Sequence, residues 1–351
     1  MEKKNQFKTI DEGKIKLIIP DNFFIKGPGK RSIGFYNMDQ KLNRDFTISF
    51  LRTVKPKLAL DAFGGTGIRG LRINREANIK TVITEINKGS FNFIENNREY
   101  NNLNVEIYNK SFQSVLNDYL FDYIDIDPYG SVLPYMDDAL INIRNKGYIG
   151  ITATDLTALT GSMERKTKRR YHALILNDNY RHESGIRLLI SEIIKRAASM
   201  DKAAFPMLSL WHSHYYRVIF KIFSSANMAD ELLNKINYVN KNNIISDLYN
   251  NVNEGPLWSG NLNSDMVNNL DIIENPDKLF LKYLNRIKNS DLSYYFLELS
   301  DIAKFKKIDT LNIEKAIDLL EKNNIKSGRT IFSDTGLKID YNLKDAIKYL
   351  Y

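Results

Sequence analysis

Residues 58–70 read Leu-Ala-Leu-Asp-Ala-Phe-Gly-Gly-Thr-Gly-Ile-Arg-Gly, and this stretch is the most informative part of the chain. A short apolar run ends in Asp61, and glycines crowd the positions that follow. The pattern predicts a buried parallel strand, a tight turn and a helix that begins near Ile68. Because glycine tolerates positive φ and has no side chain, the backbone of such a turn can lie directly against a cofactor.

The glycine spacing separates this turn from two common nucleotide-binding loops. Gly64, Gly65 and Gly67 belong to a Gly-Gly-x-Gly-x-x-Gly pattern, which differs from the dinucleotide fingerprint, and no Walker Gly-Lys-Ser/Thr follows. An acid directly before the glycines suits a nucleoside-bearing cofactor with a cationic centre. The stretch therefore favours S-adenosylmethionine, and an ordinary strand-to-helix turn is the alternative.

Composition limits the class of protein. The chain has 351 residues, 43% of them hydrophobic and 26% charged, which is typical of a globular protein large enough for two domains. Its net charge of +8 favours a polyanionic partner such as nucleic acid. It has no cysteine, which excludes disulfides and thiolate chemistry, and no apolar run of about 20 residues that could span a membrane. We therefore expect a cytoplasmic protein. We also expect it to be a monomer.

Strand-like and helical segments alternate through the first half of the chain, and a helix is predicted over residues 43–52 with Asn43 as its N-cap. The alternation predicts an α/β fold with a doubly wound parallel sheet. A Gly/Pro cluster at 255–260 marks a change in the sequence pattern and indicates a domain boundary. We therefore expect a catalytic domain with an N-terminal extension over 1–260 and a smaller α+β domain over 261–351. The strand-like segments are 57–61, 81–85, 121–127 and 147–153.

Three acids end predicted strands: Asp61, Glu85 and Asp127. In doubly wound sheets, ligands bind at the carboxyl ends of the strands, so these side chains should converge on one site. Glu85 follows the glycine turn by about 20 residues, the spacing at which an acid can accept hydrogen bonds from the ribose hydroxyls of a bound nucleoside.

The segment Asp127-Pro128-Tyr129 indicates the chemistry. Pro128 holds Asp127 in an extended conformation at the end of its strand. A carboxylate there can accept the N–H of an exocyclic amine and take its proton, while the aromatic ring stacks on the flat base. The pattern therefore favours methyl transfer to an amine of a base, although a simple Asp-Pro turn with a core tyrosine would share it.

A basic run follows at residues 164–172, Glu-Arg-Lys-Thr-Lys-Arg-Arg-Tyr-His. We interpret it as a phosphate-contacting loop, with a solvated charged face as the alternative. The histidines show no metal-ligand spacing, and we expect no metal site.

These motifs resemble those of the tRNA (guanine-N2) dimethyltransferases that act at position 26, in their archaeal form. Matching segments run from Phe35 to Gly336, nearly the whole chain. The resemblance implies a class I S-adenosylmethionine-dependent methyltransferase fold, tRNA as substrate, methylation of the guanosine N2 amine, and tRNA binding by the C-terminal domain. The segments include Phe35-Tyr36-Asn37, Asn43-Arg44-Asp45, residues 61–70, residues 125–131, Gly255-Pro256-Leu257-Trp258 and Thr335-Gly336-Leu337-Lys338.

The resemblance also completes the predicted site. It implies that Arg44, Arg69 and Glu85 contact the cofactor, that Asp127 is catalytic and that Tyr129 stacks on the guanine. Ser111-Phe112 stand where the family has Asp-Ala. The predicted cofactor-binding residues are Arg44, Asp61, Gly64, Gly65, Gly67, Arg69, Glu85, Ile86, Ser111, Phe112 and Asp127, and the predicted catalytic residues are Asp127, Pro128 and Tyr129.

Two alternatives remain open at this point. One is an amino-methyltransferase acting on another RNA, DNA or protein, which the same acid–Pro–aromatic loop would serve. The other is a non-catalytic RNA-binding protein on a methyltransferase scaffold. That second alternative predicts a damaged cofactor pocket, whereas Asp61, the glycines, Glu85 and Asp127 are all present.

Overall fold

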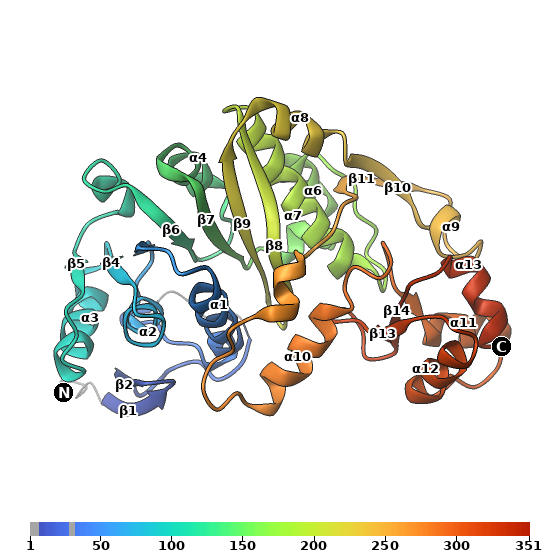
Figure 1. Cartoon of the computed structure of the whole chain (residues 1–351), viewed down its shortest axis with the longest axis horizontal. Coiled ribbons are helices and arrows are strands. Elements are labelled where there is room, and N and C mark those ends of the chain that lie inside the picture. Colours follow the sequence, from blue (N-terminus) through green and yellow to red (C-terminus); the bar gives the residue numbers. More distant parts are fainter. Residues whose placement is uncertain (1–6, 28–31) are drawn as a thin grey trace.

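The computed structural model describes residues 7–27 and 32–351. Its centre is a seven-stranded sheet in the order β5-β4-β3-β6-β7-β9-β8 (Figure 1). The strands β3 to β7 run parallel, and β9 lies antiparallel between β7 and β8. The predicted doubly wound fold is therefore confirmed, but the sheet is mixed and not purely parallel. The strands are β3 (Leu58–Asp61), β4 (Lys80–Thr84), β5 (Glu106–Tyr108), β6 (Phe121–Ile126), β7 (Ile143–Ala153), β8 (Lys202–His212) and β9 (Tyr215–Ser224).

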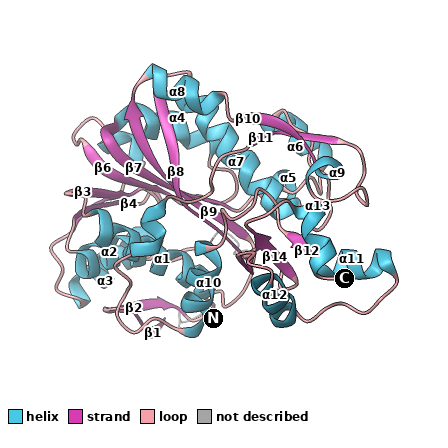
Figure 2. Cartoon of the chain, turned by 45° about the vertical axis from the view of Figure 1, so that its right-hand side comes forward, coloured by secondary structure: helices cyan, strands magenta, loops and turns pink. Residues whose placement is uncertain are grey.

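Helices cover both faces of this sheet (Figure 2). The core between them is built from fully buried aliphatic side chains such as Leu60, Ile124 and Ile149. Burial of each such side chain stabilises the fold by about 1.5–3 kcal/mol. Because helices cover both faces of the sheet, the sequences of the central strands are nearly continuous apolar runs. One face carries α1 (Lys41–Val54), α2 (Ile68–Ala77) and α3 (Lys88–Tyr100), and the other carries α4 (Leu133–Asn142), α7 (Arg181–Ala198) and α8 (Ala226–Leu233).

The start of α1 differs from the prediction. The helix begins at Lys41, directly after the 3₁₀ turn η1 (Met38–Gln40), so Asn43 lies inside the first turn and is not its N-cap. The side-chain amide of Asn43 donates instead to Gln40 Oε1 at 2.7 Å and to Thr152 Oγ1 at 3.0 Å. A tertiary contact therefore overrides the local capping preference that the sequence suggested.

The N-terminal segment forms an antiparallel hairpin, β1 (Phe7–Glu12) and β2 (Ile15–Pro20). Its apolar face, including Leu17, packs with Leu71 and Ile94 of the helices α2 and α3 in a second small core. The hairpin thus belongs to the part of the molecule that holds the glycine turn.

The remaining elements surround two smaller antiparallel sheets, of which one has the order β12-β14-β13. Helices beside an antiparallel sheet give the last part of the chain the α+β character that the sequence predicted. The basic run forms a helix, α6, so the prediction that it is a loop is wrong. The elements are α5 (Leu156–Leu159), α6 (Glu164–Tyr171), β10 (Ile236–Asn240), α9 (Lys241–Ile244), β11 (Asn253–Trp258), α10 (Lys278–Lys288), β12 (Leu297–Glu298), α11 (Leu299–Lys306), α12 (Ile313–Lys322), β13 (Ser327–Arg329), β14 (Gly336–Ile339) and α13 (Leu343–Ala346), with 3₁₀ turns η2 (Phe112–Val115), η3 (Asp265–Asn269) and η4 (Ile347–Tyr349).

Buried contacts join the C-terminal elements to the helices α1 and α7, which cover the large sheet. The rings of Phe46 and Phe280 lie 4.5 Å apart, and Lys338 Nζ binds Glu183 Oε1 at 2.7 Å with both side chains fully buried. The two predicted domains therefore share one core, and the boundary at residue 260 stays a prediction. Across 7–27 and 32–351, no helix combines the length and the apolar character that crossing a membrane requires.

Candidate active site

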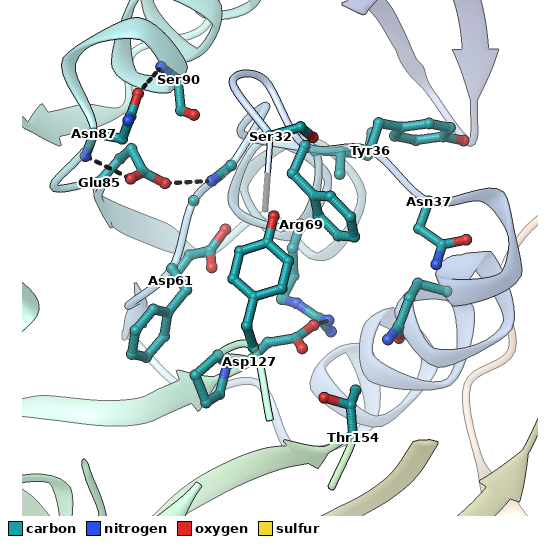
Figure 3. Close-up of a pocket in the computed structure, with 18 of the residues that line it drawn as sticks. Ser32, Tyr36, Asn37, Asp61, Arg69, Glu85, Asn87, Ser90, Asp127 and Thr154 are labelled. Carbon is teal, nitrogen blue, oxygen red and sulfur yellow. Dashed lines mark hydrogen bonds and ion pairs between the residues drawn. The ribbon is translucent and has the colours of Figure 1, made fainter. Parts of the chain in front are cut away.

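A cavity of about 520 Å³ lies at the carboxyl ends of β3, β4 and β6 (Figure 3). Chain order reverses between β3 and β6, which is the place where ligands bind in doubly wound sheets. The cavity is lined by Ser32, Ile33, Phe35, Tyr36, Asn37, Gln40, Arg44, Asp61, Phe63, Gly64, Gly65, Ile68, Arg69, Glu85, Ile86, Asn87, Ser90, Asp127, Pro128, Tyr129, Tyr135, Thr154 and His214.

The glycine turn and Glu85 form one wall of the cavity. Gly65 and Gly67 both have positive φ, +57° and +85°, which explains the need for glycine at these positions. Glu85 Oε2 accepts a hydrogen bond from the backbone nitrogen of Gly65 at 3.0 Å, and Oε1 accepts one from Asn87 at 2.7 Å (Figure 3). The turn therefore fixes the orientation of the acid that ends β4.

Asp61 lies at the base of the turn and is only 1% exposed. Its Oδ2 accepts a hydrogen bond from the backbone nitrogen of Gly70 at 2.9 Å. Burial raises the pKa of Asp61 to about 7, although the nearby Arg69 guanidinium opposes the shift. The carboxyl group is therefore poised between its neutral and ionised forms near physiological pH.

Arg44 reaches the cavity from α1 and is anchored by the N-terminal hairpin. Its Nε and Nη2 bind the two carboxylate oxygens of Glu12, each at 2.6 Å, and Nη2 also donates to the Asn37 carbonyl at 3.0 Å. Although burial opposes it, Arg44 and Arg72 lower the pKa of Glu12 to about 2. Nη1 of Arg44 donates to no described residue, which leaves N–H groups for an anion in the cavity.

Arg69 is buried, with 5% exposure, in the first turn of α2. Its Nη2 forms an ion pair with Asp127 Oδ2, and its Nε lies 3.3 Å from Asp125 Oδ1. Its Nη1 donates to Asn43 Oδ1 and Thr47 Oγ1, both at 3.2 Å. The arginine that the sequence assigned to the cofactor is thus also bonded to the predicted catalytic carboxylate.

The loop after β6 is held at Gly130 by two hydrogen bonds to Thr154, the residue that follows β7. The backbone nitrogen of Gly130 donates to Thr154 Oγ1 at 2.8 Å, and the backbone nitrogen of Thr154 donates to the Gly130 carbonyl at 3.0 Å. Tyr129 is 41% exposed, and its ring lies edge-on to Phe35 with a centroid distance of 5.0 Å. An aromatic ring and the Asp127 carboxylate therefore border the same cavity (Figure 3).

The structure brings most of the predicted site residues to this cavity and leaves three outside its lining. Gly67, Ser111 and Phe112 do not line it. Phe112 is buried against Phe63 and Tyr135, which are lining residues, so it supports the wall from behind. The residues that line it are Arg44, Asp61, Gly64, Gly65, Arg69, Glu85, Ile86, Asp127, Pro128 and Tyr129.

Sequence reasoning missed one wall of the cavity. The segment from Ser32 to Asn37 and the side chain of His214 contribute to the lining, although they were given no role. His214 Nδ1 lies 3.1 Å from Asp39 Oδ2, which ties the turn before β9 to η1. Apart from the Phe-Tyr-Asn motif, this wall carries no pattern that indicates a ligand. Among the described residues, no three His, Asp or Glu side chains could hold a metal ion together.

Comparison with known proteins identifies the family. The family model of N2,N2-dimethylguanosine tRNA methyltransferase matches residues 13–351. A tRNA (guanine(26)-N(2))-dimethyltransferase from Thermoplasma acidophilum is 42% identical over 331 residues, 94% of each chain. One from Thermoplasma volcanium is 44% identical over 332 residues, 94% of this chain and 95% of the relative.

A solved structure extends the match to three dimensions. It is that of Trm1 from Pyrococcus horikoshii in complex with S-adenosyl-L-methionine, and it matches with a TM-score of 0.82 at 26% identity. The match covers 98% of this chain and 99% of the other. With its sequence relatives and its fold in agreement, the chain belongs to the N2,N2-dimethylguanosine tRNA methyltransferase family.

Proposed function

We infer that this chain is a tRNA (guanine(26)-N(2))-dimethyltransferase, which transfers methyl groups from S-adenosylmethionine to the N2 amine of guanosine 26 in tRNA. The observation that carries the inference is that the glycine turn and the Asp127-Pro128-Tyr129 loop border one cavity in a member of this family. Family membership favours tRNA over the other amine substrates that the loop could serve, and the intact cofactor pocket argues against a non-catalytic scaffold. We expect the enzyme to act in the cytoplasm, as a monomer.

The cavity suits the nucleoside part of S-adenosylmethionine. About 520 Å³ lies within the range of ordinary ligand pockets, roughly 300–1,000 Å³. Glu85 stands at the strand end where an acid receives ribose hydroxyls, and its two oxygens keep lone pairs beyond the two backbone bonds they accept. Ile33, Phe63 and Ile86 offer apolar surface to a purine ring. The donor set therefore fits the nucleoside.

The charged groups of the cavity suit the amino-acid part. Arg44 lines the cavity, and its Nη1, which donates to no described residue, can bind a carboxylate. An ionised Asp61 would attract a cation. When bound, the cofactor supplies a methyl group on a cationic sulfur, which is activated for transfer.

Asp127 is the residue that acts on the amine. The N2 lone pair of guanine is delocalised into the ring, so the amine is a weak nucleophile. Arg69 holds Oδ2 of Asp127, whereas Oδ1 accepts no hydrogen bond from any described residue. Oδ1 can accept the N2–H of the guanine and take its proton as the N–CH₃ bond forms, and the ring of Tyr129 can stack on the base to fix its plane.

Helix α6 is our candidate for contact with the tRNA backbone. Arg165, Lys168 and Arg169 are exposed on it, and no described acid pairs with them. The helix is anchored at Asp155, whose Oδ2 accepts hydrogen bonds from Arg170 and from the Tyr171 hydroxyl, both at 3.0 Å. Asp155 directly follows the cavity residue Thr154, so the C-terminal end of α6 is tied to the segment that borders the cavity. Phosphate contacts from the exposed side chains of this helix would offset the work of extruding a base.

Nucleoside mass spectrometry tests the proposed function. Unmodified tRNA would be incubated with the protein and methyl-labelled S-adenosylmethionine, beside a transcript that carries adenosine at position 26. Labelled N2-methylated guanosine should arise only from the first transcript. Label at another nucleoside, or equal label in both transcripts, would contradict the assignment of guanosine 26.

A further inference from the structure

Arg217 is a fully buried arginine that the proposed mechanism does not use. It lies on β9 and does not line the cavity. Its Nη1 donates to Asp125 Oδ1 at 3.1 Å, and its Nη2 pairs with Asp125 Oδ2, so the guanidinium binds the carboxylate with both arms. Nη2 also donates to the Tyr123 hydroxyl at 2.7 Å. A buried charge with this many directed bonds requires an explanation.

Thr47 joins this arginine to Arg69. Its Oγ1 accepts hydrogen bonds from Arg217 Nη2 at 2.9 Å and from Arg69 Nη1 at 3.2 Å, and it donates to the Asn43 carbonyl at 2.9 Å. Thr47 is fully buried in α1. One hydroxyl therefore fixes the relative positions of two guanidinium groups that lie on different elements.

The ion pairs around Arg69 show what the contacts of Arg217 contribute. Arg69 lies between two carboxylates, with Nε 3.3 Å from Asp125 and Nη2 paired to Asp127. Although burial opposes it, Arg217 and Arg69 lower the pKa of Asp125, so this carboxylate is a strong competitor for Arg69. Because Arg217 already binds both oxygens of Asp125, the Nη2 of Arg69 remains available to Asp127.

We propose that Arg217, Asp125 and Thr47 are positioning residues that hold Arg69 against Asp127 and so orient the catalytic carboxylate. The inference rests on the proposed role of Asp127 in accepting the amine proton. In this arrangement Arg69 fixes Oδ2 and turns Oδ1 toward the base. Loss of the link through Thr47 lets Arg69 shift toward Asp125, and small displacements of a reacting group slow catalysis strongly.

Two substitutions at Thr47 separate this role from simple packing. Thr47→Val keeps the shape of the side chain and removes the hydroxyl, whereas Thr47→Ser keeps the hydroxyl and removes a methyl group. Thr53→Val is the matched control on the same helix, because Thr53 also donates to the carbonyl four residues earlier but touches neither arginine. For each variant, kcat and KM for tRNA would be measured together with the calorimetric affinity for S-adenosylmethionine and the circular dichroism spectrum.

Thr47→Val should lower kcat about tenfold, with the affinity for S-adenosylmethionine and the KM for tRNA within about twofold of the wild type. Thr47→Ser and Thr53→Val should keep kcat within about threefold. Equal kcat values for Thr47→Val and Thr53→Val would overturn the inference, as would a loss in Thr47→Ser as large as in Thr47→Val, which would indicate packing. Parallel loss of cofactor affinity and kcat in Thr47→Val would also overturn it, since the network would then serve binding.

The proposed function is tested separately by Asp127→Asn. If that variant stays fully active, Asp127 has no catalytic role and the proposed function loses its chemistry. If Asp127→Asn is inactive while Thr47→Val behaves as the Thr53→Val control, only the positioning inference fails.

Discussion

Glu85 accepts a hydrogen bond from the backbone nitrogen of Gly65 at 3.0 Å, so the acid that ends β4 and the glycine turn after β3 form one unit. The hydrogen bond forms only while the glycine turn keeps its backbone conformation. The same bond holds the Glu85 carboxylate toward the cavity. A change at either residue should therefore disturb both halves of the nucleoside site.

The first prediction concerns Gly65. Its φ is +57°, and a Cβ there would lie 3.1 Å from the Phe35 carbonyl oxygen, so Gly65→Val should distort the turn and abolish S-adenosylmethionine binding in a folded protein. Calorimetric titration measures the affinity. Gly27→Ala is the control, because Gly27 has a similar φ of +77° and no atom of the described residues lies within 4 Å of its missing Cβ. Unchanged affinity in a folded Gly65→Val protein would remove the cofactor assignment.

Asp61 predicts how cofactor affinity depends on pH. Burial raises its pKa from 3.8 to about 7, so the carboxyl is largely protonated below that pH in the free protein. A cationic ligand favours the ionised form, so binding below pH 7 must release a proton and is weakened. Affinity should therefore rise with pH up to about 7 and level off above it. Titrations in buffers of different ionisation enthalpy, repeated on Asp61→Asn, should show that the variant lacks this step.

Removal of the Asp127 carboxylate, the proposed proton acceptor, should slow methyl transfer and spare cofactor binding. Asp127→Ala should lower the rate of methyl transfer by about 100-fold or more, because the amine loses its proton acceptor. Calorimetric affinity for the cofactor should change much less. Asp118→Ala, which removes an exposed acid outside the cavity, is the control. Transfer within a few-fold of wild type in Asp127→Ala would assign the proton to another group.

Tyr129 should act through the face of its ring. Tyr129→Phe should retain nearly full activity, whereas Tyr129→Ala should weaken productive tRNA binding by roughly 1–3 kcal/mol, the usual worth of one base stack. Single-turnover methylation at increasing enzyme concentration separates binding from chemistry. A large defect in Tyr129→Phe would show that the hydroxyl is needed, and the stacking role would be wrong.

The sequence predicts which strand ends share one edge of the sheet, but it does not predict which buried side chains from distant elements contact each other. The three acids Asp61, Glu85 and Asp127 could be placed together from sequence, because parallel strands share one carboxyl edge. The link from Arg217 to Arg69 could not, since it requires knowing that the late strand β9 inserts beside β7 and faces α1. A long arginine side chain can reach any nearby acid, so its partner is decided by packing that no local pattern encodes.

The same distinction explains the errors. Asn43 fits a helix N-cap by its residue type, but its amide is bonded to Thr152 on a neighbouring strand, and the helix begins two residues earlier. The basic run is interpreted from its lysines and arginines as a phosphate-contacting loop. It forms α6 because Thr167 and Tyr171, four residues apart, bury one side of a short helix against the core.

The last prediction concerns the charged face of α6. A guanosine inside folded tRNA must be extruded to reach a cavity at the strand ends, which costs a few kcal/mol. Phosphate contacts elsewhere can offset this cost, and they make affinity fall steeply with salt. Arg165, Lys168 and Arg169 carry charges that no described acid neutralises, whereas Arg170 is already paired to Asp155.

Replacement of Arg165, Lys168 and Arg169 by Gln should weaken tRNA binding and reduce the slope of log affinity against log salt by about 1 for each lost phosphate contact. Cofactor affinity should not change, because these side chains do not line the cavity. The control is the triple Gln variant of Lys57, Lys146 and Lys235. These exposed lysines also pair with no described acid, so the variant removes the same charge from another part of the surface. If both triple variants flatten the slope equally, tRNA responds to net charge alone, and α6 is not the surface that it contacts.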